Sequence, residues 1–203
     1  MNISQEDREN ISTAIRAAEA KTSGEIVCVL ARTSSDATAL PIFLAAVVAL
    51  ALPWLLLAVT EFSFQRILLL QIVIFFALSL LLCLPRVRVA LLPRRARRAA
   101  AHRAAMEQFM VRGIARKKDR SGILIFVSLA ERYARIIADE GIAARVPQSD
   151  WQAAVDSLVT HMSSGRIADG FLSAINACET VLVTHFPRTE MSRDELPDRI
   201  YLI

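Results

Sequence analysis

Two uncharged runs decide the architecture of this chain: LPIFLAAVVALALPWLLLAV over residues 40–59 and ILLLQIVIFFALSLLLCL over residues 67–84. An α-helix rises about 1.5 Å per residue, so each run is long enough to cross a hydrocarbon layer of about 30 Å. Both runs lack the polar stripe that a core helix of a globular protein normally shows. The sequence therefore predicts a transmembrane helical hairpin within residues 39–85.

The charges that flank the two runs predict their orientation. The connection between them carries only Glu61 and Arg66, whereas a dense group of arginines follows the second run. Arginine-rich flanks stay on the cytoplasmic side of a membrane, and two crossings return the chain to its starting side. We therefore expect both termini in the cytoplasm. The predicted membrane-surface residues are Arg86, Arg88, Arg94, Arg95, Arg97, Arg98 and Arg103.

The basic charge of the chain is local. Residues 86–120 contain 12 of the 24 Lys and Arg residues and only two acids, although the net charge of the whole chain is +4. Because this segment directly follows a predicted span, the bilayer and its anionic lipid headgroups are the expected partners. Nucleic acid is not expected, since topology and lipid contact already account for the charge. A protein partner is expected, but the sequence does not identify it.

The sequence before the hairpin predicts one helix and one strand. Ser4 to Asp7 has the form of a capping box, and Ile11, Ile15 and Ala18 follow at helical spacing, so we expect a helix over about residues 5–21. The run EIVCVLA at 25–31 is nearly all apolar, which is typical of a strand that is covered on both faces.

The sequence after the hairpin predicts a helix, a strand hairpin and two further helices. Residues 94–112 are alanine-rich and favour a juxtamembrane helix. The runs at 123–127 and 133–138 predict two antiparallel strands. A second capping box at 149–152 predicts the start of an amphipathic helix, whose expected apolar face is Trp151, Val155, Leu158, Val159 and Met162. The expected buried face of the last helix is Ile167, Phe171, Ile175, Cys178 and Leu182, followed by a polar tail from Pro187.

This order of elements predicts an α/β fold that is interrupted by the transmembrane hairpin, with a first strand that rejoins the later strand pair. The first helix and strand, in residues 1–38, are the first part of a split domain. Residues 39–85 form the hairpin, and residues 86–203 supply the juxtamembrane helix, the rest of the split domain and the tail. The strand at 25–31 is expected to join the same sheet as the strand at 123–127.

Familiar enzyme signatures do not occur in this sequence. There are only six glycines, and no phosphate-binding glycine loop, H-E-x-x-H motif or nucleophile elbow is present. Cys28, Cys83 and Cys178 are isolated within apolar runs, which is typical of buried thiols in a reducing compartment. No cofactor is therefore firmly indicated.

Several segments nevertheless resemble one protein family. The block DRSGILIFVSLAERYARIIADEGIAARV at 119–146 is similar to the TPM domain family, as are GEIVCVLA at 24–31, MEQFMVRGI at 106–114 and ELPDRI at 195–200. The inserted hairpin resembles a bacterial two-span membrane branch of that family, which implies a bacterial inner-membrane location. The resemblance implies a small mixed sheet flanked by helices, and it also implies possible phosphatase activity and calcium binding. Many relatives carry G-x-G-[LI]-E after the strand hairpin, whereas this chain has DEGIA at 139–143.

Four carboxylates are the candidate metal ligands: Asp119, Asp139, Glu140 and Asp150. Oxygen ligands of this kind suit Ca²⁺ or Mg²⁺ if the loops converge, and a solvated acidic loop is the alternative. Phosphoryl transfer also needs a cation, for which Arg132 and Arg135 are candidates. Arg132 beside Glu131 is alternatively a surface pair in the hairpin turn.

The sequence thus favours a membrane-anchored cytoplasmic module. We expect a non-catalytic interaction, assembly or regulatory factor for membrane proteins. The alternative is a divalent-metal-dependent phosphatase that uses the acidic loop near Asp139. Transport is disfavoured because the two spans contain no ionisable residue.

Overall fold

A computed structural model of the chain describes residues 3–35, 39–116, 120–188 and 196–203. These residues form two compact units. The α/β unit comprises residues 1–34 and 100–203, and the helical unit comprises residues 35–99. The α/β unit is therefore assembled from two separate parts of the sequence.

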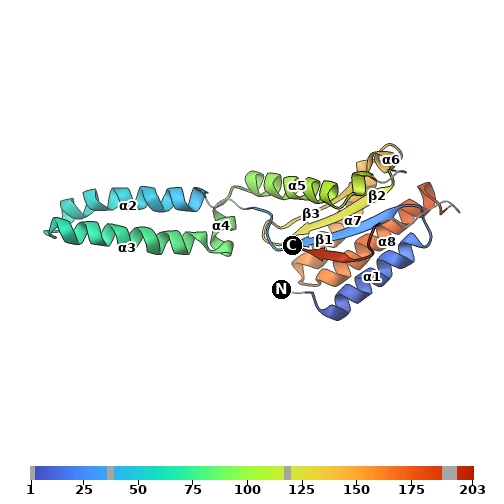
Figure 1. Cartoon of the computed structure of the whole chain (residues 1–203), viewed down its shortest axis with the longest axis horizontal. Coiled ribbons are helices and arrows are strands. Elements are labelled where there is room, and N and C mark those ends of the chain that lie inside the picture. The colour runs from blue at the N-terminus through green and yellow to red at the C-terminus, as the bar shows by residue number, and fades with distance from the viewer. Residues whose placement is uncertain (1–2, 36–38, 117–119, 189–195) are drawn as a thin grey trace. The chain divides into compact units, whose positions relative to one another are not determined.

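The α/β unit contains a mixed four-stranded sheet in the order β3-β2-β1-β4 (Figure 1). β1 is parallel to β2 and β4, and β2 is antiparallel to β3. The strands are β1 (Glu25–Ala31), β2 (Gly122–Ser128), β3 (Tyr133–Ala138) and β4 (Ile200–Leu202). Every residue of β1 and β2 is buried, as their continuous apolar runs predict for central strands. The expected small mixed sheet is confirmed, and residues 25–31 lie in the same sheet as residues 123–127, as predicted. The two strands also pair directly, which was not predicted.

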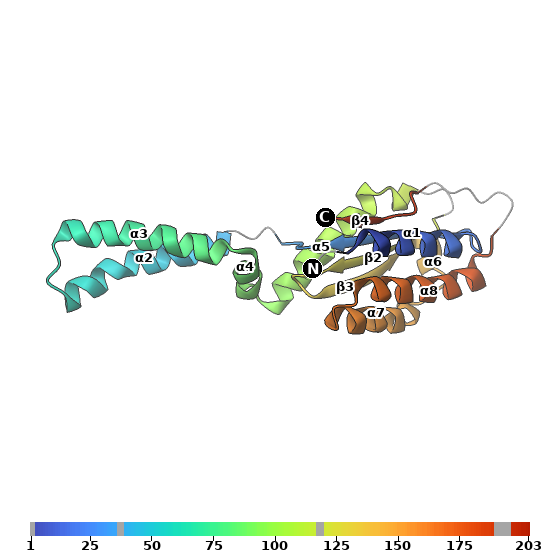
Figure 2. The same ribbon diagram turned by 90° about the horizontal axis from the view of Figure 1, so that it is seen from below.

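Helices cover both faces of this sheet (Figures 1 and 2). One face packs against three helices, α1 (Gln5–Glu19), α7 (Gln148–Ser163) and α8 (Ile167–His185). The other face packs against α5 (Arg94–Val111), through Ala105 and Phe109. Alternate residues of β1 and β2 enter the two cores, because successive side chains of a strand point to opposite faces. Two shorter elements are η1 (Ile114–Arg116) and α6 (Glu140–Ala143).

The predicted capping box of α1 is confirmed. The Ser4 hydroxyl accepts a hydrogen bond from the Asp7 amide at 3.0 Å, and the Asp7 carboxylate accepts one from the Ser4 amide at 3.1 Å. Ile11 and Ile15 are fully buried against the sheet. The helix ends at Glu19, two residues before the expected end.

The second predicted capping box, at the start of α7, is wrong. The helix begins at Gln148 with Pro147 as its N-cap, and Pro147 has no side chain that can cap an amide. Because Ser149 already lies inside the first turn, its hydroxyl donates to the Asp150 carboxylate at 3.1 Å instead. The expected apolar face is also corrected: Val159 is 46% exposed, because one residue step rotates it by about 100° from the buried Leu158.

The polar tail ends in a strand that the sequence reading missed. β4 pairs with β1, with Ile200 opposite Cys28 and Leu202 opposite Leu30. Two further hydrogen bonds continue this edge: the Ile203 amide donates to the Leu30 carbonyl at 3.0 Å, and the Arg32 amide donates to the Ile203 carbonyl at 2.8 Å. A three-residue strand carries too little periodicity to be recognised, and it forms because β1 offers an unpaired edge.

The helical unit is a pair of long helices followed by a short one. Its elements are α2 (Ala39–Val59), α3 (Phe64–Cys83) and α4 (Pro85–Leu91). Ala45 and Ala49, one turn apart, are buried in this unit, while Trp54 and Phe76 are mostly exposed. Small residues inside and large apolar residues outside are typical of helices that pack in lipid.

Three described helices are long and apolar enough to span a membrane: α2, α3 and α8. α8 has another explanation for its apolar composition, because Phe171, Ile175 and Cys178 are fully buried in the core of the α/β unit. α2 and α3 instead expose most of their large apolar side chains. The composition of α2 and α3 thus fits the predicted hairpin, whereas α8 fits a core helix.

Candidate functional site

The open edge of β3 is the main feature of the α/β unit that packing leaves unused. Within the described residues, β3 pairs only with β2, and five of its six residues are partly exposed. The Asp139 amide donates to the Gly122 carbonyl at 2.9 Å, so these two residues form a hydrogen-bonded pair of the antiparallel ladder. Hydrogen-bonded and non-hydrogen-bonded pairs alternate along such a ladder. The alternation of such pairs directs the amide and carbonyl groups of Ala134, Ile136 and Ala138 away from β2.

Two clefts border this edge, and together they are lined by every residue of β3. The first, which we call the α5–β3 cleft, has a volume of about 270 Å³. Its lining residues are His102, Met106, Arg135, Ile136, Ile137, Ala138, Ala143, Val146 and Trp151. The second, which we call the hairpin cleft, has a volume of about 400 Å³. Its lining residues are Val127, Ser128, Leu129, Arg132, Tyr133, Ala134, Val159, Met162 and Ser163.

The walls of the two clefts come from opposite faces of the sheet. α5 supplies His102 and Met106, whereas α7 and the loop before it supply Val146, Trp151 and Met162. The Tyr133 hydroxyl lies 3.4 Å from Nδ1 of His102, so a hydrogen bond links β3 to the α5 wall. None of the described residues that line either cleft is acidic.

A buried polar network holds the start of β3 in place. The Glu131 carboxylate is 4% exposed and accepts hydrogen bonds from the Thr33 hydroxyl and the Ser34 amide, both at 3.1 Å, and from the Ser128 hydroxyl. The Ser34 hydroxyl donates to the Ser128 hydroxyl at 2.8 Å. Buried polar groups need such partners, so this network ties the hairpin turn to the segment that follows β1.

The predicted surface pair of Glu131 and Arg132 is therefore wrong. Glu131 turns inward, whereas Arg132 is exposed and adopts a left-handed backbone conformation with φ of 51°. A non-glycine residue adopts this conformation mainly in tight turns, and the Arg132 amide closes the turn by donating to the Leu129 carbonyl at 3.3 Å. The turn sends the two side chains in different directions, and Arg132 lines the hairpin cleft.

The candidate metal ligands lie at the other end of β3. The Asp139 side chain is 5% exposed; its Oδ1 accepts a hydrogen bond from the Glu140 amide at 2.7 Å and lies 3.6 Å from an Arg120 nitrogen. Its Oδ2 is buried and has no hydrogen-bond partner among the described residues. Asp139 is therefore the N-cap of α6.

The structure does not gather the other candidates around Asp139. Glu140 is exposed, and Asp150 is exposed in the first turn of α7. Asp119 lies outside the described residues. Among the residues that are described, no three His, Cys, Asp or Glu side chains form a group that could hold a metal ion. The metal hypothesis stays a prediction that depends on Asp119 or on a movement of the exposed acids.

The predicted membrane-surface arginines lie on α4 and α5. The Arg88 guanidinium donates to the Ser35 carbonyl at 2.9 Å, and the side chain of Arg86 is outside the description. Arg97 is half-buried. The exposed members are Arg94, Arg95, Arg98 and Arg103.

A carboxyl pair that the sequence reading missed joins α1 to the segment before β4. Oε1 of Glu19 accepts a hydrogen bond from the Ile26 amide at 2.7 Å, and Glu19 is also hydrogen-bonded to Asp198. Burial raises the pKa of Glu19 to about 9, with Asp198 and Glu25 adding to the increase. Arg16 lies 3.3 Å from the other side of Asp198. One sequence feature could have indicated that Glu19 faces the core: it follows the buried Ile15 by four residues and so lies on the same helix face.

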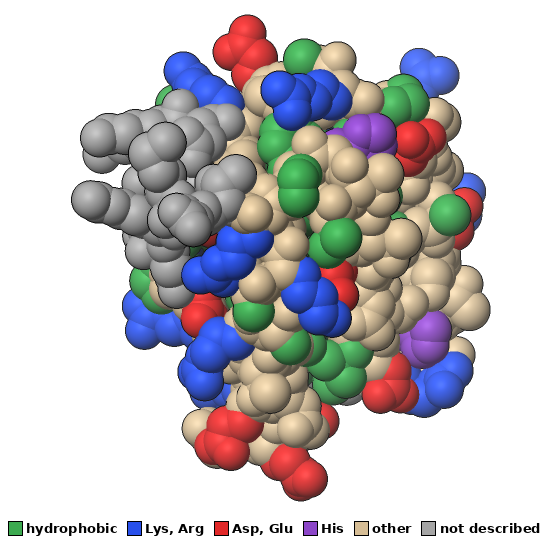
Figure 3. All heavy atoms as spheres, turned by 90° about the vertical axis from the view of Figure 1, so that its right-hand side faces the viewer, with side chains coloured by type: hydrophobic (Ala, Val, Ile, Leu, Met, Phe, Trp, Pro, Cys, Tyr) green, Lys and Arg blue, Asp and Glu red, His purple; other side chains and the backbone are tan. Residues whose placement is uncertain are grey.

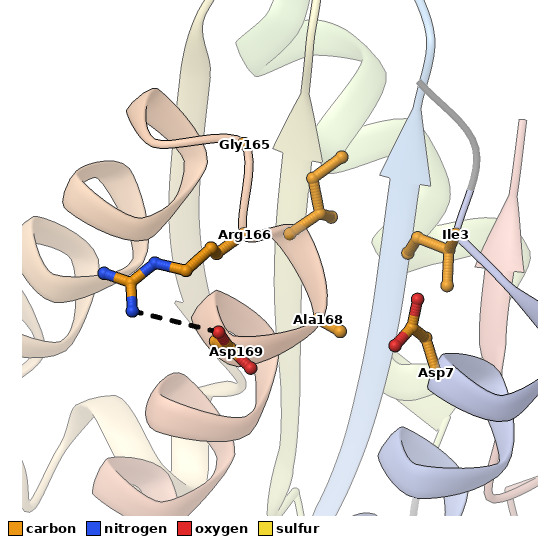
Figure 4. Close-up of a pocket in the computed structure, with 7 residues that line it drawn as sticks. Ile3, Asp7, Gly165, Arg166, Ala168 and Asp169 are labelled. Atoms are coloured by element: carbon orange, nitrogen blue, oxygen red, sulfur yellow. Dashed lines mark ion pairs between the residues drawn. The ribbon is translucent and has the colours of Figure 1, made fainter.

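A third hollow, of about 200 Å³, lies between the first turns of α1 and α8 (Figure 4). Its charged groups already have partners: Arg166 forms an ion pair with Asp169 at 4.0 Å, and Asp7 belongs to the capping box. On the end of the α/β unit seen in Figure 3, basic, acidic and hydrophobic side chains are interspersed, as on a solvated surface. The edge of β3 remains the stronger candidate.

Comparisons with known proteins support the fold. Residues 85–181 match the model of the family described as the TPM domain. The NMR structure of BA42 protein from the psychrophilic bacterium Bizionia argentinensis is similar, with a TM-score of 0.62 and 20% sequence identity over 100% of this chain and 96% of that chain. No curated protein sequence matches. At 20% identity this likeness shows a shared fold, and a fold does not determine function.

Proposed function

We propose that this chain is a membrane-anchored module that binds a segment of another protein along β3. In this proposal it acts as an interaction, assembly or regulatory factor for membrane proteins. The observation that carries the proposal is the open edge of β3, which is bordered along its whole length by clefts lined mainly by apolar side chains. A rigid strand edge with adjoining side-chain pockets suits recognition of a polypeptide.

The location follows from the helical unit. α2 and α3 have the length and composition of membrane spans. The exposed arginines of α5 support an orientation with both termini in the cytoplasm of a bacterium and contact with anionic lipid headgroups. An anchor of this kind keeps the β3 site close to other membrane proteins, which raises its effective concentration toward them.

A divalent-metal-dependent phosphatase is the second candidate. The name of the matching family includes the word phosphatase, and the buried Asp139 has one oxygen without a partner among the described residues. Ca²⁺ or Mg²⁺ would bind at this carboxylate if Asp119 completes a ligand set, and the Arg120 guanidinium, which lies 3.6 Å from Oδ1, would then repel the cation. The G-x-G-[LI]-E motif of the resembling family ends in an acid. The corresponding residue of this chain is Ala143, which lines the α5–β3 cleft. The apolar wall at that position favours binding over phosphoryl transfer.

A site-specific photo-cross-linker tests the proposal. Met106 is 41% exposed and lines the α5–β3 cleft, so a benzophenone amino acid at this position in the full-length chain should cross-link a membrane protein in native membranes. The same amino acid at exposed Asn176 on α8 is the matched control. Adducts that are absent at both positions, or equally abundant at both, contradict a binding site on β3.

A further inference from the structure

The backbone of β3 specifies how a partner segment binds, an inference that rests on the proposed function. We infer that the partner is an extended peptide in which acidic and apolar residues alternate, and that it adds to β3 as a fifth strand of the sheet. The amide and carbonyl groups of Ala134, Ile136 and Ala138 point away from β2 and form one row of donors and acceptors. Ala134 and Ala138 are partly exposed, whereas Ile136 between them is fully buried, so the added strand reaches Ile136 only when the side chains that cover it move aside. Strand addition satisfies this row with main-chain hydrogen bonds.

The two cleft walls determine which side chains the added strand carries. Successive side chains of a strand point to opposite faces of the sheet, so one half of them meets α5 and the other half meets α7. The α7 side is apolar, with Val146, Trp151 and Met162. This side accepts apolar side chains of the peptide.

The α5 side is basic. Tyr133 and Ile137 pack on the core beneath α5, and Arg135 lies between them with the same parity on β3. Arg135 gives the α5–β3 cleft a positive charge, and none of the described residues that line this cleft is acidic. Acidic side chains that point to this side therefore meet opposite charge, which favours the acidic-apolar alternation over other patterns.

A second copy of this chain is a poorer occupant. Pairing β3 with the β3 of another copy brings together two strands that each carry Arg135 and no acid. Like charges near each other across strands are destabilising. Arginine on an edge strand is also a common protection against pairing with itself. Self-association thus becomes an outcome that the experiment must detect.

The experiment uses the full-length chain in lipid nanodiscs and three synthetic octapeptides. The first alternates Glu with Val, the second has the same sequence with N-methyl groups on the amides of alternate residues, and the third has Lys in place of Glu. N-methylation removes backbone donors and leaves the side chains unchanged. We expect affinity, measured by fluorescence anisotropy, to fall about tenfold or more for the second and third peptides, since each loses several hydrogen bonds or reverses its charge.

Hydrogen exchange gives an independent readout of the register. The first peptide should slow exchange at the amides of the partly exposed Ala134 and Ala138 and leave those of Arg135 and Ile137 unchanged, because the latter already bond to β2. The Ile136 amide is buried before the peptide binds, so it is not used as a readout. An Ala138→Pro variant should lose about the same affinity as the N-methylated peptide, whereas the matched Ala138→Gly variant retains its amide and its binding. If the proline variant fails to fold, the two peptides still provide the comparison on the unmodified chain.

Each outcome separates strand addition from the broader function. Equal binding of the N-methylated peptide with no change in exchange overturns strand addition, and persistent cross-links from position 106 then leave the β3 binding site standing. Absence of both peptide binding and cross-links overturns both proposals. Protection of the Ala134 and Ala138 amides without peptide, together with dimeric nanodisc complexes, assigns the edge to a second copy and overturns the acidic-peptide inference.

Discussion

The carboxyl group of Glu19 should make the stability of the α/β unit fall as pH rises. Its side chain is partly buried beside Asp198 and Glu25, and this burial raises its pKa from 4.5 to about 9. A carboxyl group whose pKa is higher in the folded state binds its proton more tightly there. The favourable contribution is complete below about pH 4.5 and is lost progressively as pH rises toward 9.

The expected magnitude follows from this shift. When the pH lies between the pKa of unfolded Glu19 and that of folded Glu19, each increase of one pH unit lowers the free energy of unfolding by at most about 1.4 kcal/mol. From pH 5 to pH 8 the Glu19 contribution therefore falls by up to about 4 kcal/mol, and we expect about 2–4 kcal/mol. Glu19→Gln removes the titration and keeps an oxygen that can accept the Ile26 amide hydrogen bond.

The assay compares wild type with Glu19→Gln. In a Trp54→Phe background, Trp151 is the remaining tryptophan and is buried in the α/β unit, so its fluorescence reports urea unfolding of that unit. The two proteins should be similar in stability at pH 5, and the glutamine variant should be more stable at pH 8 by about 2–4 kcal/mol. Parallel pH profiles, or a glutamine variant that is weaker at pH 8, would refute a partly buried, protonated Glu19.

Three further predictions concern topology, the hairpin turn and catalysis. Reporter fusions at residue 20, near Ser63 and after Ile203 should place only the middle one outside the cytoplasm, and a periplasmic carboxyl terminus contradicts the arginine asymmetry. Glu131→Ala should lower the free energy of unfolding by about 1–3 kcal/mol, because the buried Ser128 hydroxyl and the Thr33 and Ser34 donors lose their acceptor. Glu140→Ala, at an exposed position, serves as the control. Equal stability of the two variants contradicts the hydrogen-bond network around Glu131. A phosphomonoester assay with Ca²⁺ or Mg²⁺ should show turnover below about 1 s⁻¹. Faster turnover that vanishes in the Asp139→Ala/Glu140→Ala double variant would favour the phosphatase. A metal-dependent rise in melting temperature without turnover would indicate that the loop binds a metal ion.

Local patterns were sufficient for most elements of the fold. Ile11 and Ile15 on α1, the continuous apolar runs of β1 and β2, and Phe171 and Cys178 on α8 all lie where their spacing predicts. The small mixed sheet followed from the same patterns together with the family resemblance. These features depend on residues that are close in sequence, or on strands whose burial is visible in composition.

The candidate site was only partly visible in the sequence. The β2–β3 hairpin was predicted, and the Asp139 and Glu140 loop at its end was singled out. The clefts beside β3 were not predicted, because His102, Arg135 and Trp151 lie on three elements that only folding brings together. The lack of acids among the described residues that line the α5–β3 cleft likewise appears only when these elements are assembled.

The sequence by itself determined the helices, the central strands and the two long apolar runs, because periodicity and hydrophobicity act over a few neighbouring residues. Only the tertiary structure decided that Ile200 to Leu202 pair with β1, that Glu131 turns inward to Ser128, and that Glu19 is partly buried beside Asp198. In each case the partner is distant in sequence or set by a turn, and the energy comes from satisfying buried polar groups or an unpaired strand edge. Such groups select their partners by position in space, and local sequence patterns do not encode that position.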